Sequence, residues 1–169
     1  MAEPTQFLGK YRGTVVNNVD PMGIGRIQAQ VPDVLGDNTS SWALPCFPVA
    51  GSGMGHYAVP PVGAGVWVEF EQGDRSYPIW TGCWYGVASE LPVEAGSGPP
   101  GIPNHVLETT GRRVIVLSDD PATGITLKVP SGASIVINDA GIQIGNGHGA
   151  SISLTGNTVT INDGALSVT

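Results

Sequence analysis

The end of the chain, ASIVINDAGIQIGNGHGASISLTGNTVTINDGALSVT (residues 133–169), decides the fold. Ile, Val and Leu occupy every second position in short bursts, and Gly, Asn or Asp separates one burst from the next. A period of two gives each burst one apolar and one polar face, as in a β-strand. Each burst is too short to bury its own apolar face. The stretch therefore predicts stacked short strands whose core is completed by other chains.

The repeat begins near residue 124 and has a period of about eight residues, which indicates a quasi-one-dimensional stack. Eight residues supply one strand and one corner, about a third of a closed turn, so three chains would complete it. We therefore predict an obligate homotrimer, in which each repeat advances about 4.8 Å along a shared axis. The side chains predicted to fill the trimer core are Ile125, Leu127, Val129, Ile135, Ile137, Ile142, Ile144, Ile152, Leu154, Val159, Ile161, Leu166 and Val168.

Composition favours turn-rich β structure and almost no helix, because the chain has 25 Gly and 14 Pro among 169 residues and only 12% charged residues. The formal net charge is −7, and the seven basic residues form no stripe, which disfavours binding to nucleic acid or to an anionic membrane surface. No run approaches the ~20 apolar residues of a membrane span. No secretion signal is visible at the N-terminus, so we expect synthesis in the cytoplasm without a signal peptide.

The chain divides into three segments: residues 1–86, a Gly/Pro-rich linker at 87–105, and the repeat segment at 106–169. All Trp, Tyr and Phe residues lie in the first segment. That segment predicts five strands, at residues 9–18, 25–32, 41–49, 65–72 and 77–86, in the manner of a small closed barrel. Two cysteines, Cys46 and Cys83, stand in its apolar stretches and are interpreted as buried thiols rather than a disulfide or a metal site.

A motif series runs through this first segment: GRIQAQVP (residues 25–32), WALPC (42–46) and VPPVGAGVWVEFEQGDRSYPIWTGCWYG (59–86). The series resembles the oligonucleotide/oligosaccharide-binding (OB) barrel of phage baseplate spike proteins, which include the phage baseplate assembly protein V group and the VgrG spikes of type VI secretion. The matching positions are Gly25, Arg26, Pro32, Pro61, Gly63, Val66, Val68, Phe70, Gly73, Asp74, Pro78 and Gly82. The fold class is therefore predicted as all-β: a five-stranded OB-fold barrel followed by a triple-stranded intertwined β-helix that forms a homotrimeric needle.

The resemblance implies a structural, membrane-piercing central spike at the baseplate of a contractile injection machine, assembled into a phage tail or a tail-like particle. It implies a separate hub protein bound by the barrel, because the hub-like domain of VgrG proteins is absent from this sequence. The open strand edge after the last repeat is a liability. We therefore expect a tip protein of the PAAR type to dock on Leu166, Val168 and Thr169, ahead of the target cell membrane.

No catalytic residue and no cofactor are predicted. His148 is an even number of positions from Ile142 and Ile144, so its side chain could point to the same face and lie on the trimer axis. Some spikes of this family bind iron there through an H-x-H pair, but Asn146 and Ala150 stand at those spacings here. A corner or solvent-facing histidine is the favoured interpretation, and no metal site is predicted.

Three alternatives stay open from the sequence. The repeat could be an adhesin-like or amyloid-like stack. The barrel could be an OB-fold module that binds oligonucleotide or oligosaccharide, which a basic groove with exposed aromatic side chains would favour. Finally, the chain could be a cell-wall hydrolase, although about twenty linker residues stand where some relatives insert a lysozyme domain.

Overall fold

The computed structural model describes residues 5–168 of the chain. The described chain forms two compact units, with the boundary between residues 90 and 91. Regular structure is nearly all β, as the composition predicts. Helix within residues 5–168 is limited to one four-residue α-helix and four short 3-10 helices: α1 (Pro32–Leu35), η1 (Glu71–Gly73), η2 (Ala88–Glu90), η3 (Val93–Gly96) and η4 (Asn162–Gly164).

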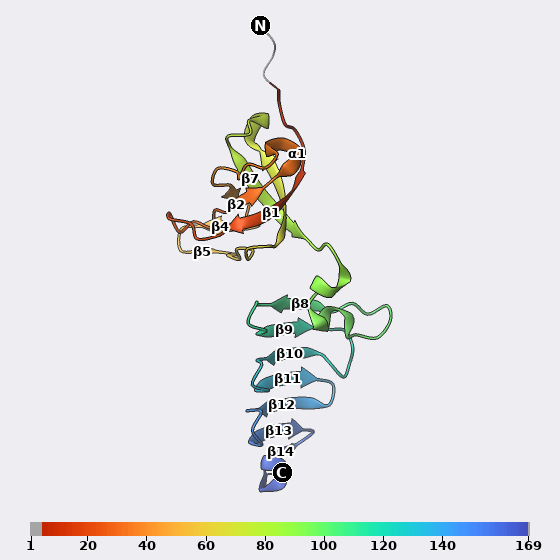
Figure 1. Ribbon diagram of the computed structural model, residues 1–169. Helices are drawn as coiled ribbons and strands as arrows, with labels where there is room; N and C mark the ends of the chain where they lie inside the picture. Colours follow the sequence, from red (N-terminus) through yellow and green to blue (C-terminus); the bar gives the residue numbers. More distant parts are fainter. Residues whose placement is uncertain (1–4, 169) are drawn as a thin grey trace. The chain divides into compact units, whose positions relative to one another are not determined.

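The first unit is built on a five-stranded sheet in the order β2-β1-β6-β7-β3 (Figure 1). Its strands are β1 (Tyr11–Asn17), β2 (Gln28–Gln30), β3 (Leu44–Pro45), β6 (Gly65–Phe70) and β7 (Pro78–Trp84). Neighbouring strands are antiparallel except β3, which runs parallel to β7. An antiparallel bridge between Ile27 and Ala43 joins the two ends of the sheet through backbone hydrogen bonds of 3.2 and 2.7 Å. The strand order and this closure confirm the predicted OB-fold barrel.

The barrel core is formed by the inward-facing side chains of its central strands, which alternate with outward-facing ones. On β6, Val66, Val68 and Phe70 are buried, and the residues between them face outward. Trp80 of β7 completes the core, and its indole Nε1 donates a hydrogen bond of 3.0 Å to the carbonyl oxygen of Gly25. The other buried residues of this cluster are Val15, Ile27, Ala29, Val31 and Ala43. The barrel therefore stands on its own hydrophobic core.

The third predicted strand is much shorter than expected. Only Leu44 and Pro45 form β3, because Pro45 and Pro48 lack the N–H that a ladder needs. The chain continues as a small hairpin of β4 (Ala50–Gly51) and β5 (Met54–Gly55), which the sequence did not predict. Both cysteines are free, and both are exposed in the single chain. The interpretation of Cys46 and Cys83 as buried thiols is therefore wrong for one chain, since Cys46 follows β3 and Cys83 lies in β7 beyond its last buried residue, Trp80.

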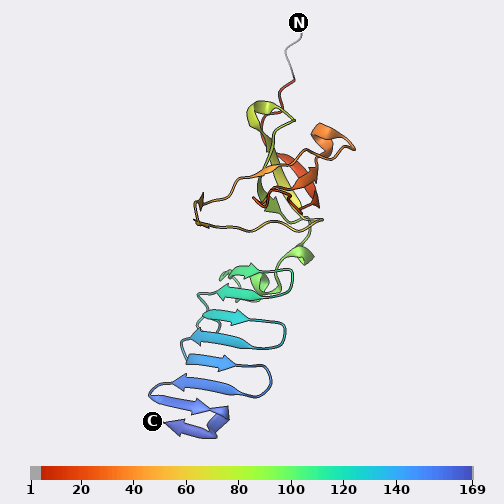
Figure 2. The ribbon, with the colours of Figure 1, turned by 90° about the vertical axis from the view of Figure 1, so that its left-hand side faces the viewer.

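The second unit is an eight-stranded antiparallel sheet in which every strand pairs with the next one along the chain (Figure 2). Its strands are β8 (His105–Glu108), β9 (Val114–Leu117), β10 (Ile125–Lys128), β11 (Ser134–Asn138), β12 (Gly141–Gly145), β13 (Ser151–Thr155), β14 (Thr158–Ile161) and β15 (Leu166–Val168). The sequence predicted the strands from residue 124 onward. It assigned residues 106–123 to the same domain but identified no strand there, and it did not predict that the strands run antiparallel. One chain thus forms a continuous wall by its own hydrogen bonds.

Residues 91–104, which belong to the predicted linker, form part of this second unit. Asn104 ties the segment together, since its Nδ2 donates hydrogen bonds of 2.8 and 3.3 Å to the Glu94 carbonyl oxygen and the Ser97 hydroxyl. Glu94 also pairs with Lys128 of β10. This ion pair lowers the pKa of the Glu94 carboxyl, chiefly through the hydrogen bond from Lys128. The segment is therefore anchored to the sheet.

Candidate assembly surface

One face of the second sheet carries two columns of aliphatic side chains. The strand register places Ile135 opposite Ile144 and Leu127, and Ile144 in turn opposite Ile152, so one column crosses the sheet without interruption. It is continued by Ile115 at one end and by Ile161 and Leu166 at the other. The second column contains Leu117, Ile125, Ile137, Ile142, Leu154, Val159 and Val168. The two columns together form what is called here the apolar face.

The apolar face is open to solvent in the single chain. Ile135, Ile144 and Ile152 are 37%, 40% and 38% exposed, although each has aliphatic neighbours above and below. The opposite face is mostly polar over the same strands: Gln143, Ser153 and Thr160 lie in one row, which Val136 of β11 continues. An aliphatic surface of this size normally marks an interaction site in a soluble protein. The wall therefore has one face suited to solvent and one suited to a partner.

The apolar face is longer than the sequence indicated. Leu107, Ile115 and Leu117 lie on it in β8 and β9, and all three are exposed. Sequence reasoning missed them because Val106, Val114 and Val116 fill the intervening positions, so the segment shows no alternation. Val129, by contrast, follows the last paired residue of β10 and lines a small pocket with Val93 and Pro130. It therefore continues neither column.

The C-terminal end of the sheet exposes the predicted docking residues. Leu166 and Val168 on β15 are 54% and 59% exposed. Within the described part of the sheet, β15 pairs with β14 alone. Thr169 lies outside the described residues. The last strand thus presents two aliphatic side chains and one edge of its backbone.

His148 lies in the turn between β12 and β13 and is exposed. The side-chain oxygen of Asn146 accepts hydrogen bonds from the backbone N–H groups of His148 and Ala150, at 2.8 and 3.0 Å. Asn146 therefore shapes this turn, as Asx turns do. Within residues 5–168 of one chain, no three His, Cys, Asp or Glu side chains are grouped in a way that could hold a metal ion. No described helix is long and apolar enough to span a membrane.

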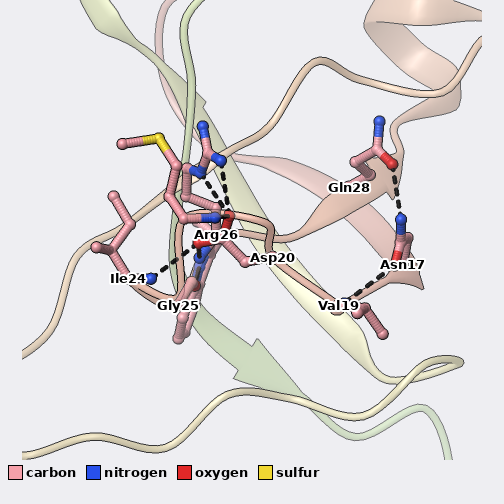
Figure 3. Close-up of polar contacts among 9 residues, drawn as sticks. Asn17, Val19, Asp20, Ile24, Gly25, Arg26 and Gln28 are labelled. Atoms are coloured by element: carbon pink, nitrogen blue, oxygen red, sulfur yellow. Dashed lines mark hydrogen bonds and ion pairs between the residues drawn. The ribbon is translucent and has the colours of Figure 1, made fainter.

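In the barrel, the long β1–β2 loop is held by one ion pair (Figure 3). The Asp20 carboxylate accepts hydrogen bonds from the Arg26 guanidinium, at 2.9 and 2.7 Å, and from the backbone N–H groups of Met22, Ile24 and Arg26. The Arg26 hydrogen bonds, followed by those from the backbone, hold the pKa of Asp20 well below its usual range. Arg26 also lies over the Trp42 ring, 5.3 Å from its centroid. Arg26 is thus a structural residue of the loop.

Two family models match successive parts of the chain. Residues 11–85 match the type VI secretion system/phage-baseplate injector OB domain, and residues 104–167 match the phage baseplate V C-terminal trimerisation domain. These boundaries coincide with the barrel and with the eight-stranded sheet. The second match supports a homotrimer.

Two curated relatives come from Pseudomonas aeruginosa. The type VI secretion system spike protein VgrG4b is 38% identical over 58 residues, which cover 34% of this chain and 7% of VgrG4b. The type VI secretion system spike protein VgrG5 is 39% identical over 74 residues, which cover 41% of this chain and 9% of VgrG5. The chain therefore spans under a tenth of the length of each relative. From its two matched domains and its fold, the chain belongs to the phage baseplate V/VgrG-like family of baseplate spike proteins.

Proposed function

We propose that three copies of this chain form the central, membrane-piercing spike of a contractile injection machine. The observation that carries the proposal is the apolar face, whose two aliphatic columns both run from β9 to β15 and stay largely open in one chain. Three such walls, set around an axis with these faces inward, would cover one another. The predicted trimer-core residues other than Val129 all lie on this face.

Energetics favour coupled folding and assembly of the needle. Complete burial of an aliphatic side chain of this size contributes about 1.5–3 kcal/mol, and one isolated wall leaves over a third of several of these side chains exposed. Because this burial is completed only between chains, association would stabilise the folded wall by mass action. A stack of hydrogen-bonded strands around a dry core is stiff, which suits a part that transmits force along its axis.

The role is mechanical and needs no catalytic group. The barrels would dock on a hub protein at the end of the tail tube, and the C-terminal strands would receive a conical tip protein of the PAAR type. Leu166 and Val168 support the second contact, because they are exposed on the last strand described. On firing, sheath contraction would drive the needle through the membrane of the target cell.

The proposal is tested on particles from a strain that encodes the chain. With an affinity tag on the chain, tail-like particles are pelleted by ultracentrifugation, and the chains per particle are counted by quantitative mass spectrometry. Three copies per particle are expected. A chain found only in the supernatant, with normal particles in the pellet, would contradict the role as a spike.

Docking of the tip is tested separately by pull-down with the PAAR-type protein encoded beside the chain. Leu166→Asp should abolish capture, because the last strand would then present a charge in place of an apolar side chain. Thr155→Asp is the matched control, since Thr155 is an exposed residue at the end of β13 and away from the terminal strand. Equal capture of both variants would refute the docking surface.

A further inference from the structure

The turns of the second sheet lie along two sides of it, at the two ends of its strands, and these two sides, called edges here, differ in charge. In an antiparallel meander, successive turns lie at alternate edges, as Figure 2 shows. The turns that follow β8, β10, β12 and β14 lie at one edge, called here the basic edge (residues 109–113, 129–133, 146–150 and 162–165). The turns that follow β9, β11 and β13 lie at the other, called here the acidic edge (residues 118–124, 139–140 and 156–157).

Every basic residue of the sheet belongs to the first of these edges. Arg112 and Arg113 are in its first turn, and Lys128 is the last residue of β10, next to its second turn. The acidic edge has only carboxylates among its charged residues: Asp119, Asp120 and Asp139. The loops of the basic edge contain one carboxylate, Asp163, near the C-terminal end of the sheet, and Glu108, the last residue of β8, lies next to the first turn as Lys128 lies next to the second.

The three carboxylates of the acidic edge are brought together by the fold. The backbone N–H of Asp139 donates a hydrogen bond of 3.2 Å to the carbonyl oxygen of Pro121, and Asn138 Nδ2 donates one of 2.8 Å to that of Ala122. The turns after β9 and β11 therefore pack against each other. Asp119 and Asp139 are exposed, and Asp120 accepts a hydrogen bond of 2.6 Å from the Thr123 hydroxyl.

On the basic edge, Arg113 is available for a partner. Its Nη1 donates a hydrogen bond of 3.3 Å to the carbonyl oxygen of Gly111, and no carboxylate of the described residues lies within ion-pair distance of it. Lys128, by contrast, is paired with Glu94, and the charge of Arg112 helps to lower the pKa of Glu94. Arg113, like Arg112 beside it, is thus an exposed cation of the sheet that has no carboxylate of its own chain within ion-pair distance in the part described.

We propose that the basic edge of each chain docks on the acidic edge of the next chain around the threefold axis, with Arg113 facing Asp119 and Asp120. This inference rests on the proposed trimer. In a ring of three identical walls, each seam joins one edge of a chain to the opposite edge of its neighbour, so complementary edges close the ring. The turn with Arg113 and the turn with Asp119 differ by one strand position, about 4.8 Å along the axis, which an arginine side chain can span.

The seams would then fix the arrangement that the apolar face leaves open. Aliphatic columns stabilise association but specify direction weakly, whereas opposite charges suppress wrong pairings. Two basic edges brought together would place Arg113 against Arg113, and two acidic edges would do the same with carboxylates. The charge pattern therefore selects a head-to-tail ring over a two-fold pairing of walls.

Zero-length cross-linking of the full-length chain tests the seam. Arg113→Lys keeps the charge and supplies an amine that a carbodiimide can join to a carboxylate. A link between position 113 and Asp119 or Asp120 must come from two chains, because the four residues of β9 separate them by about 14 Å within one chain. We expect covalent dimers and trimers on a denaturing gel, and a linked peptide joining position 113 to residues 119–120.

The unaltered chain is the matched control, because arginine gives no such link. Native mass spectrometry of the same samples shows whether the trimer is present. A trimer without a link from position 113 to the acidic edge would overturn the seam and leave the spike proposal intact. A monomer would overturn the trimer itself, and with it the proposed function.

Charge reversal gives a second readout. Arg113→Glu should raise the concentration at which the trimer dissociates at least tenfold at low salt, and Asp119→Lys should do the same. Both substitutions in one chain should recover most of the loss, since the seam then carries the same pair in reverse. Arg75→Glu and Asp37→Lys, on exposed residues of the barrel, are the charge-matched controls. Additive losses in the double variant would overturn the pairing.

Discussion

Two substitutions on one strand separate the roles of the two faces of the wall. Ile144 and Gln143 are neighbours on β12, but Ile144 lies on the apolar face and Gln143 on the polar one. Ile144→Asp would place three carboxylates in a shared apolar core, whereas Gln143→Asp adds the same charge on the solvent side. We expect the first variant to lose the trimer and the second to keep it.

The size of the effect follows from the exposure of Ile144. Ile144→Ala removes three carbon groups, worth about 2.4 kcal/mol at about 0.8 kcal/mol per buried CH₂. Because Ile144 is 40% exposed in one chain, about 1 kcal/mol of this is gained only in the trimer. Three chains lose about 3 kcal/mol, roughly a hundredfold in the association constant. An unpaired buried carboxylate costs several kcal/mol more per chain, so Ile144→Asp should abolish assembly at micromolar concentration.

Sedimentation equilibrium over a range of concentrations measures the association constants of the four proteins. We expect the unaltered chain and Gln143→Asp to have the same association constant for the trimer. That of Ile144→Ala should be about a hundredfold smaller, and Ile144→Asp should stay monomeric. Circular dichroism checks that the barrel stays folded in each variant. If Ile144→Asp remained trimeric, or if Gln143→Asp dissociated as readily, the inward orientation of the apolar face would be refuted.

Three further predictions concern the barrel. Ile27→Ala should lower the free energy of unfolding in urea by about 2–5 kcal/mol, because Ile27 is fully buried. The control Ile24→Ala, at a 44% exposed position, should change this free energy by under about 1 kcal/mol. Equal losses in the two variants would contradict the assigned core. Asp20→Asn should destabilise the barrel at neutral pH. Because the pKa of Asp20 is lowered by folding, its charge stabilises the barrel fully above the ordinary value of about 3.9, and this contribution falls as the pH drops below that value. In urea melts, the difference in the free energy of unfolding between the unaltered chain and Asp20→Asn should therefore narrow as the pH falls below about 4. A difference that widened would refute the role of the ion pair. Finally, Cys46 should react with a thiol reagent faster than Cys83 near pH 8, because partial desolvation raises the pKa of the Cys83 thiol although the residue as a whole is exposed. Single Cys→Ser variants assign the rates, and a faster Cys83 would contradict this.

The alternation of apolar and polar residues along the sequence was the most reliable guide to this fold. The pattern of Val66, Val68 and Phe70 predicted both the strand and its buried face, because one side of that strand packs on a core and the other meets solvent. The same reasoning predicted the columns from Ile135 to Ile161. It failed at β9, where Val114 and Val116 are buried by intrachain packing while Ile115 and Leu117 face outward. A strand with apolar side chains on both faces, one packed within the chain and the other on the apolar face, loses the alternation that identifies it.

Features that depend on pairing could not be predicted in the same way. Side chains alternate with a period of two in parallel and in antiparallel strands alike. The repeat therefore could not predict that neighbouring strands run antiparallel. The division of charge between the two edges follows from that meander, because it decides which turns lie side by side. Asp119 and Asp139 are separated by two strands in sequence, and only the register of β10 and β11 places them at one edge.

The central claim is that the apolar face of one chain is completed by two other copies. Native mass spectrometry of the full-length chain, sprayed from neutral buffer at low micromolar concentration, tests it most directly. The account predicts a dominant species at three times the 17.4 kDa chain mass, with little monomer. A dominant monomer, with a barrel that is folded by circular dichroism, would contradict it.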